Sequence, residues 1–235
     1  GLTNTITAMA QARLDSVPML VVSGVNRSDT IGKNLGFLHE LPDQNGLASR
    51  AALWSRTIFK PEELEPAIED AFRDFATKRP GPINIQIPTD VMKLAAAAAG
   101  ETSAGVSIPP VDVAAAVKAA DLINRSARPV IIAGGGARGA TGSVIQLAER
   151  LDAPVVQTVN ARGIMHKHPL SVPASPSLVA VRQLLAQSDC VIAVGTEFGE
   201  TDFDMYGDGS FPVLHNLIRI DIDAVARREM MDKAR

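Results

Sequence analysis

The opening of the chain constrains its fold most strongly, because a helix there leads directly into a short buried strand. Residues 1–4 (Gly-Leu-Thr-Asn) predict a turn that feeds a helix of small residues. Residues 15–24 then predict a short apolar strand that ends at a glycine. This order belongs to an α/β layer that the chain enters part-way through a repeating unit. We therefore expect an α/β fold and interpret the chain as an internal fragment of a longer protein.

Helix and strand patterns alternate through the rest of the first part of the chain. Residues 26–46 are polar and punctuated by glycine, and we expect a loop there. A helix starting at Pro61 is predicted by the proline and the acidic residues of its first turn. Residues 83–88 alternate apolar and polar, which predicts a strand with one buried face. The predicted buried stripe of the helix consists of Leu64, Ile68, Ala71, Phe72 and Phe75.

A second series of elements follows a segment rich in alanine and proline. We expect helices near residues 113–124, 144–151 and 178–186, and strands at 128–133, 154–158, 190–194 and 217–222. Such alternation predicts parallel sheets covered by helices on both faces. The predicted fold is therefore two parallel-sheet α/β units, with the second unit Rossmann-like. Their predicted bounds are 1–92 and 111–235, the second incomplete at its C-terminus, with a linker at 93–110.

Composition excludes several classes of protein. The net charge is −3, and the basic residues form no cluster with aromatic ones, so we expect no nucleic-acid partner. No apolar run approaches the ~20 residues of a membrane span, and we expect no membrane partner. The single cysteine, Cys190, is predicted to be a buried strand residue that forms no disulfide within the chain. This cysteine usage fits a cytoplasmic protein.

A glycine run follows the first strand of the second unit. Gly134, Gly135 and Gly136 begin a Gly-x-Gly-x-x-Gly pattern between a strand and a helix, where backbone can approach an anion. The acidic residue that an NAD site would carry after the next strand is missing, because residues 155–158 contain none. A nucleotide or flavin site and a plain tight turn both remain open.

Two further strand ends are predicted to border the same crevice. Gly195 and Thr196 follow one strand, and Asp221 follows another, where ligands bind in open α/β sheets. Asp223 could accept a ligand hydrogen bond or cap a helix. We expect no metal site, and we interpret the nearby acidic residues as a solvated loop. These acids are Glu197, Glu200, Asp202, Asp204 and Asp208, and the histidines at 166 and 168 are likewise interpreted as loop residues.

Several stretches resemble one enzyme family. Residues 1–4 resemble the end of the Gly-Pro-Gly-x-Thr-Asn segment in the pyrimidine-binding domain of thiamine diphosphate enzymes of the acetolactate synthase and 2-oxo-acid decarboxylase type. The likeness continues through residues 15–18, 37–40 and 79–91, and the second unit resembles the family's central domain. It carries the family's Arg-Pro, Ala-Pro-Val, His-Pro-Leu and Ile-Asp-Ile-Asp motifs, and the resemblance covers nearly the whole chain.

The resemblance implies a cofactor, a reaction and candidate residues. The implied cofactors are thiamine diphosphate with Mg²⁺, acting on a small 2-oxo acid that loses carbon dioxide; the carbanion is then protonated or attacks a second carbonyl. Gly1, Thr3 and Asn4 would lie near the aminopyrimidine. His39 stands where the synthases carry glutamine and is the candidate proton donor, although a purely structural loop histidine remains an alternative. FAD is possible, through residues at the family's flavin-contacting strand ends, namely Gly134, Gly135, Gly136, Thr158, Gly195, Thr196 and Asp221.

Other features depart from the family pattern. The glutamate that activates the cofactor and the diphosphate-binding domain with its Mg²⁺ site would lie outside this chain, so we expect the chain alone to be inactive. Residues 171–176 do not resemble the corresponding stretch of the synthases, which counts against FAD.

Residues 39–44 and 195–202 resemble the guanidino-oxopentanoate (2-ketoarginine) decarboxylase branch. The family implies a homodimer or homotetramer. The alternative from another class is a non-catalytic nucleotide- or flavin-binding α/β module.

Overall fold

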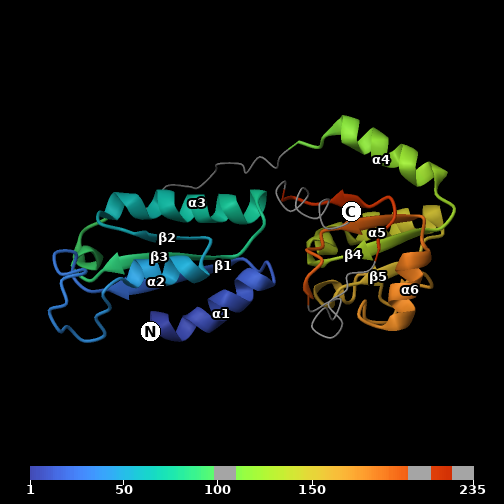
Figure 1. Ribbon diagram of the computed structural model, residues 1–235. Coiled ribbons are helices and arrows are strands. Elements are labelled where there is room, and N and C mark those ends of the chain that lie inside the picture. Colours follow the sequence, from blue (N-terminus) through green and yellow to red (C-terminus); the bar gives the residue numbers. More distant parts are fainter. Residues whose placement is uncertain (98–109, 201–212, 224–235) are drawn as a thin grey trace. The chain divides into compact units, whose positions relative to one another are not determined.

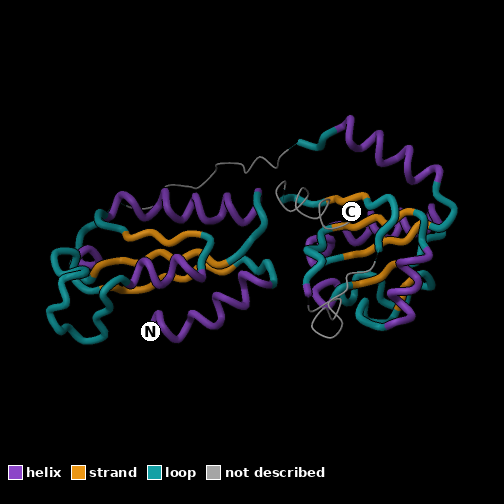
Figure 2. Tube along the Cα trace, viewed as in Figure 1, coloured by secondary structure: helices purple, strands orange, loops and turns teal. Residues whose placement is uncertain are grey.

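The computed structural model describes residues 1–97, 110–200 and 213–223 and divides into two compact units. Unit 1 comprises Gly1–Pro109 and unit 2 comprises Pro110–Arg235. Each contains one parallel sheet with helices packed on it, which confirms the predicted fold of two parallel-sheet α/β units (Figures 1 and 2). Most of the predicted linker, like the acids at 202, 204 and 208, lies outside the described residues.

Unit 1 is built on a three-stranded parallel sheet of order β1-β3-β2. In Figure 1, α3 lies over one face of this sheet and α1 and α2 lie over the other. Alternate residues of β1 serve the two faces, since Val21 packs with α1 and α2 whereas Leu20 packs with α3. The elements are α1 (Leu2–Leu14), β1 (Met19–Val25), α2 (Gln44–Ala51), β2 (Trp54–Thr57), η1 (Pro61–Glu63), α3 (Leu64–Thr77), β3 (Pro82–Pro88) and η2 (Val91–Lys93).

Unit 2 is built on a five-stranded parallel sheet of order β6-β5-β4-β7-β8. Residues Ile131 and Ile192 point to the face covered by α5, whereas Val130 and Val191 point to the face covered by α6. The elements are α4 (Val113–Arg125), β4 (Pro129–Ala133), η3 (Gly135–Ala140), α5 (Thr141–Leu151), β5 (Val155–Gln157), η4 (Val159–Ala161), β6 (Ser171–Val172), α6 (Val179–Gln187), β7 (Cys190–Val194) and β8 (Ile218–Ile220).

The prediction that residues 83–88 bury only one face was wrong. β3 is the central strand, and the helices α1 and α2 cover one of its faces while α3 covers the other, so its polar residues Asn84 and Gln86 are fully buried. They are satisfied by cross-strand partners: Asn84 Nδ2 donates to Ser55 Oγ at 2.8 Å, and Gln86 Nε2 donates to Thr57 Oγ1 at 2.7 Å. Buried amides with partners are tolerated, whereas unpaired ones are costly.

Two other expectations differ from the structure, and three short elements were not expected at all. Phe72 is 57% exposed and does not belong to the buried stripe of α3, where Ala67 and Ala71 are fully buried. Helix α1 already begins at Leu2, so residues 3 and 4 lie in its first turn rather than in a preceding loop. The helix and strand of residues 44–57 were not predicted. Nor was the two-residue strand β6.

Candidate functional site

The predicted residues fall into two groups, one in each unit, and each group is described separately. In unit 1, Gly1, Thr3 and Asn4 lie at the amino end of α1, and all three are exposed. The strands of unit 1 run toward the end of the unit that also carries the loop of residues 26–43 (Figure 1). His39 is on that loop with its side chain exposed.

The loop of residues 26–43 is anchored to the sheet at both of its ends. Near its start, Ser28 donates to Asp90 from its backbone nitrogen at 2.9 Å and from its hydroxyl at 2.6 Å. These hydrogen bonds lower the pKa of Asp90, which follows the end of β3. Past its end, the Gln44 side chain donates to the Gly24 carbonyl at 2.9 Å and to Gln86 Oε1 at 3.2 Å. The loop is therefore fixed at the carboxyl ends of β1 and β3.

The middle of the same loop closes around a carboxylate. Glu40 accepts hydrogen bonds from the backbone nitrogens of three consecutive residues, Leu35, Gly36 and Phe37. The residue that precedes this carboxylate, His39, has a positive φ of 58°. Sequence reasoning missed the roles of Glu40, Asp90 and Gln44. An acid directly after a strand or at the end of a glycine-containing loop was the available clue.

In unit 2, the glycine run packs against the turn that follows β7. A Cβ on Gly134 would lie 2.2 Å from the Gly195 carbonyl oxygen and 2.4 Å from Thr196 Cα. Gly195 has φ +57°, and a Cβ there would lie 2.6 Å from the Gly136 carbonyl carbon. The backbone nitrogen of Gly136 donates to the Gly195 oxygen at 3.0 Å. Contact between these two loops therefore explains Gly134, Gly136 and Gly195 without a ligand.

The other predicted residues of unit 2 lie at the same edge of the sheet. Thr158 is buried and donates its backbone N–H to the Ala133 carbonyl at 3.0 Å, beside the glycine run. Asp221 pairs with Arg219 at 3.1 Å, and Arg219 also donates to the Thr196 carbonyl at 2.7 Å. The structure thus brings together the strand ends that the sequence placed at one crevice, and Asp221 is engaged by Arg219 there.

A small cavity of about 250 Å³ opens beside this edge, at the ends of β5 and β6. Gln157 forms one wall, where its side chain donates to Ser171 Oγ at 3.0 Å and accepts from the Met165 nitrogen at 3.2 Å. Arg162 and Gly163 line the cavity as well, together with residues 172–176. Part of this lining is the stretch that departs from the synthase pattern.

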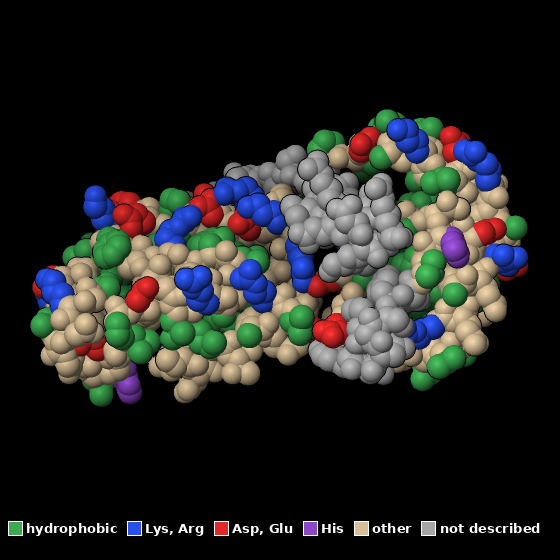
Figure 3. All heavy atoms as spheres, in the orientation of Figure 1, with side chains coloured by type: hydrophobic (Ala, Val, Ile, Leu, Met, Phe, Trp, Pro, Cys, Tyr) green, Lys and Arg blue, Asp and Glu red, His purple; other side chains and the backbone are tan. Residues whose placement is uncertain are grey.

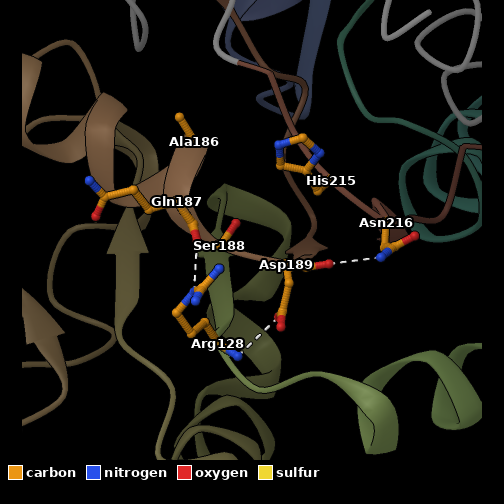
Figure 4. A pocket seen from close by; sticks show the side chains of 7 residues that line it. All are labelled: Arg128, Ala186, Gln187, Ser188, Asp189, His215 and Asn216. Carbon is orange, nitrogen blue, oxygen red and sulfur yellow. Dashed lines mark hydrogen bonds between the residues drawn. The ribbon is translucent and has the colours of Figure 1, made fainter.

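A larger cavity of about 570 Å³ lies at the opposite edge of the sheet, where β4, β7 and β8 begin (Figure 4). Asp189 there accepts from the backbone nitrogens of Ala127 at 2.8 Å and Arg128 at 3.0 Å, and from the Ser126 hydroxyl. The Ser126 bond, followed by the backbone bonds, lowers the pKa of Asp189 to about 2. Arg128 Nε donates to the Gln187 carbonyl at 2.9 Å. These groups join the loop before β4 to the loop before β7.

No group of three or more His, Cys, Asp or Glu in residues 1–97, 110–200 and 213–223 is arranged to hold a metal ion. Within the same residues, no helix is long and apolar enough to cross a membrane.

Cys190 is buried as predicted, and burial, followed by the charge of Asp189, raises the pKa of its thiol. His166 and His168 lie in the turns before β6, and His168 Nε2 is 3.2 Å from Glu149 Oε1.

Comparison with known proteins decides which family these units represent. Residues 116–232 match the family model described as the central domain of thiamine pyrophosphate enzymes. The chain belongs to the thiamine pyrophosphate enzyme family. This result supports the resemblance found in the sequence, and it favours the enzyme interpretation over a non-catalytic nucleotide-binding module.

Individual relatives agree with this assignment. The chain is 40% identical over 228 residues to a probable 2-ketoarginine decarboxylase of Pseudomonas aeruginosa, covering 95% of this chain and 40% of that protein. It is 32% identical over 207 residues to the large subunit of acetolactate synthase isozyme 1 of Escherichia coli, covering 85% and 36%. The chain thus spans less than half the length of these relatives.

A solved structure shares the fold. A thiamin diphosphate-dependent enzyme from Mycobacterium smegmatis superposes with a TM-score of 0.71 over 96% of this chain and 42% of that chain, at 21% sequence identity. At this identity the likeness concerns the fold alone, which is the two-unit α/β architecture described above.

Proposed function

We propose that this chain is part of a thiamine diphosphate-dependent enzyme that decarboxylates a 2-oxo acid and then protonates the carbanion or joins it to a second carbonyl. Unit 1 would be the later part of the pyrimidine-binding domain. The family assignment supports the cofactor class, and the relative from Pseudomonas aeruginosa makes 2-ketoarginine the first substrate to test. Thiamine diphosphate supplies the electron sink that makes the loss of carbon dioxide possible.

The residues at the amino end of α1 fit the cofactor's aminopyrimidine. The amide of Asn4 and the hydroxyl of Thr3 are exposed, and together they can donate to and accept from ring nitrogens. Their role would be to orient the pyrimidine. Mg²⁺ would accompany the diphosphate, which we place on a domain outside this chain.

His39 carries the proposal, because it presents an exposed imidazole on a loop anchored at the carboxyl ends of β1 and β3. Its role would be to donate a proton to the carbanion after carbon dioxide leaves. A glutamine at this position, as in the synthases, cannot act as an acid. His39 thus favours protonation over ligation.

We leave FAD out of the proposal. Two glycines of the run that suggested a flavin, Gly134 and Gly136, are explained by packing against the turn at Gly195 and Thr196. Assembly as a homodimer or homotetramer remains a prediction from the resemblance, and light scattering on the purified protein tests it. A cytoplasmic location remains a prediction from the cysteine content.

The test is release of carbon dioxide from 2-oxo acids by the full-length protein that contains this chain, purified and supplied with thiamine diphosphate and Mg²⁺, starting with 2-ketoarginine and pyruvate. We expect His39→Gln to lower kcat for aldehyde formation by about 10²- to 10⁴-fold, the usual contribution of a general acid. The control His166→Gln changes an exposed histidine in unit 2 and should leave kcat unchanged. Equal rates in the two variants would refute the role of His39.

A further inference from the structure

The loop that carries His39 is wound around the carboxylate of the next residue. Glu40 Oε1 accepts from the Leu35 nitrogen at 3.1 Å, and Glu40 Oε2 accepts from the nitrogens of Gly36 at 2.7 Å and Phe37 at 3.0 Å. The backbone nitrogen of Glu40 donates in return to the Phe37 carbonyl at 3.0 Å. The side chain and the backbone nitrogen of Glu40 therefore both hydrogen-bond within the same short loop.

The backbone of this loop needs such support. Asn34 and His39 have φ values of +53° and +58°, and Gly36 has +79°. A left-handed conformation is disfavoured for residues that carry a Cβ, and it persists where surrounding contacts impose it. The hydrogen bonds to Glu40 span the segment between Asn34 and His39, so they stabilise this conformation.

The backbone hydrogen bonds also stabilise the charged form of the Glu40 carboxylate. Partial desolvation raises the pKa of Glu40, but backbone N–H bonds from Phe37, Leu35, Gly36 and Asn34 together outweigh it and lower the pKa. A carboxylate that accepts several backbone N–H groups has little capacity left for a substrate or a proton.

The neighbours of Glu40 on this loop are unusually apolar for a surface segment. Leu35, Phe37 and Leu38 are 59%, 45% and 82% exposed, and apolar side chains reach the surface at this end of unit 1 (Figure 3). The two leucines are largely exposed and bury little apolar surface that could hold the loop, whereas Glu40 holds it through three backbone hydrogen bonds.

We propose that Glu40 is a positioning residue for His39: its carboxylate holds residues 34–40 in the conformation that presents the His39 imidazole at the carboxyl ends of β1 and β3. This inference rests on the proposed function, in which His39 donates the proton. It assigns Glu40 no contact with substrate or cofactor.

The matched variants are Glu40→Gln and Glu62→Gln. Glutamine keeps the size of Glu40 but replaces one oxygen with an NH₂ group that faces backbone N–H donors, so at least one of the three hydrogen bonds is lost. The loop ends stay anchored through Asp90 and Gln44, so the fold should persist. Glu62 is an exposed glutamate in η1 and serves as the control.

The first measurement is nuclear magnetic resonance of the purified protein. In Glu40→Gln we expect the amides of residues 35–37 to exchange about tenfold faster, as the loss of one hydrogen bond to a charged acceptor implies, and the His39 ring resonances to shift. Glu62→Gln should match the wild-type protein. Unchanged amide exchange or unchanged His39 resonances in Glu40→Gln would overturn the inference.

The second measurement is a double-mutant cycle in the decarboxylation assay. Misplacing His39 should lower kcat by about 10- to 100-fold in Glu40→Gln, with KM nearly unchanged. The double variant His39→Gln/Glu40→Gln should be no slower than His39→Gln, because both changes act through one imidazole. Additive losses would show that Glu40 acts elsewhere and overturn the inference. If the full-length wild-type protein turns over no 2-oxo acid, the proposed function fails and the resonance measurements alone decide whether Glu40 positions His39.

Discussion

Replacing Gly134 with alanine tests whether the glycine run is used for packing between loops. The backbone of Gly134 has φ −103° and ψ −178°, which alanine adopts without strain, so the substitution changes only the available space. The new Cβ would lie 2.2 Å from the Gly195 oxygen, 2.4 Å from Thr196 Cα and 2.6 Å from Thr196 Cβ. Because two of these atoms are backbone, a rotamer change cannot relieve the contact.

The cost follows from what must move. Separating the two loops by about 1 Å disrupts the bonds from the Gly134 nitrogen to the Val194 oxygen at 2.8 Å and from the Gly136 nitrogen to the Gly195 oxygen at 3.0 Å. Overpacking costs about 1–3 kcal/mol, and each lost hydrogen bond adds about 0.5–1.5 kcal/mol. We therefore expect Gly134→Ala to lower the free energy of unfolding of unit 2 by about 3 kcal/mol.

The matched control is Gly142→Ala in the first turn of α5. A Cβ on Gly142 would meet nothing within 4 Å, and alanine favours helix over glycine by about 0.5–1 kcal/mol, so this variant should be slightly more stable than the wild-type protein. Urea unfolding followed by thiol labelling of the single cysteine, Cys190, reports on the core of unit 2. With a slope of about 2 kcal/mol per molar, the Gly134→Ala midpoint should fall by about 1.5 M.

A Gly134→Ala protein as stable as the wild type would refute the packing argument. The loops after β4 and β7 would then not be in contact as described, and the glycine run would again need a ligand to explain it. Loss of stability in both glycine variants would instead indicate a general intolerance of this segment.

Two further variants test other features of the structure. Asp189 has a pKa lowered to about 2, so its stabilising effect is present above about pH 4 and is lost as the pH falls toward 2. Urea unfolding should therefore show Asp189→Asn destabilised at pH 6 and much less destabilised at pH 2.5, whereas the control Asp152→Asn, at an exposed residue, should show no such change. A loss of stability in Asp189→Asn that does not depend on pH would contradict the assignment. Ile192→Ala removes a fully buried side chain and should cost about 2–5 kcal/mol, whereas Phe72→Ala, at a side chain 57% exposed, should stay within about 1 kcal/mol; calorimetric denaturation checks both, and equal costs would mean that the core is wrongly located.

The local elements were largely predictable because their signals are local. The apolar runs that became β4 and β7, the helix that starts after Pro61 and the glycine after β4 all depend on neighbouring residues in the sequence. The short elements of residues 44–57 escaped prediction because their polar sequence shows no clear period, and α2 depends on the Asp43 cap, which accepts from the Gly46 nitrogen at 2.7 Å.

The sequence by itself determined the two α/β units, the strand ends where polar and glycine residues gather, and a family resemblance that the comparisons confirmed. Only the tertiary structure decided what those residues contact. Gly134 meets Gly195 across about 60 positions of sequence, and Asn84 is buried because its strand is central in a sheet whose two faces are covered by helices. Glu40 is close to its partners in sequence, yet its role depends on three backbone nitrogens that converge only once the loop is folded. Sequence patterns report burial and backbone preference, whereas the pairing of polar groups is fixed by distances that exist only in the folded chain.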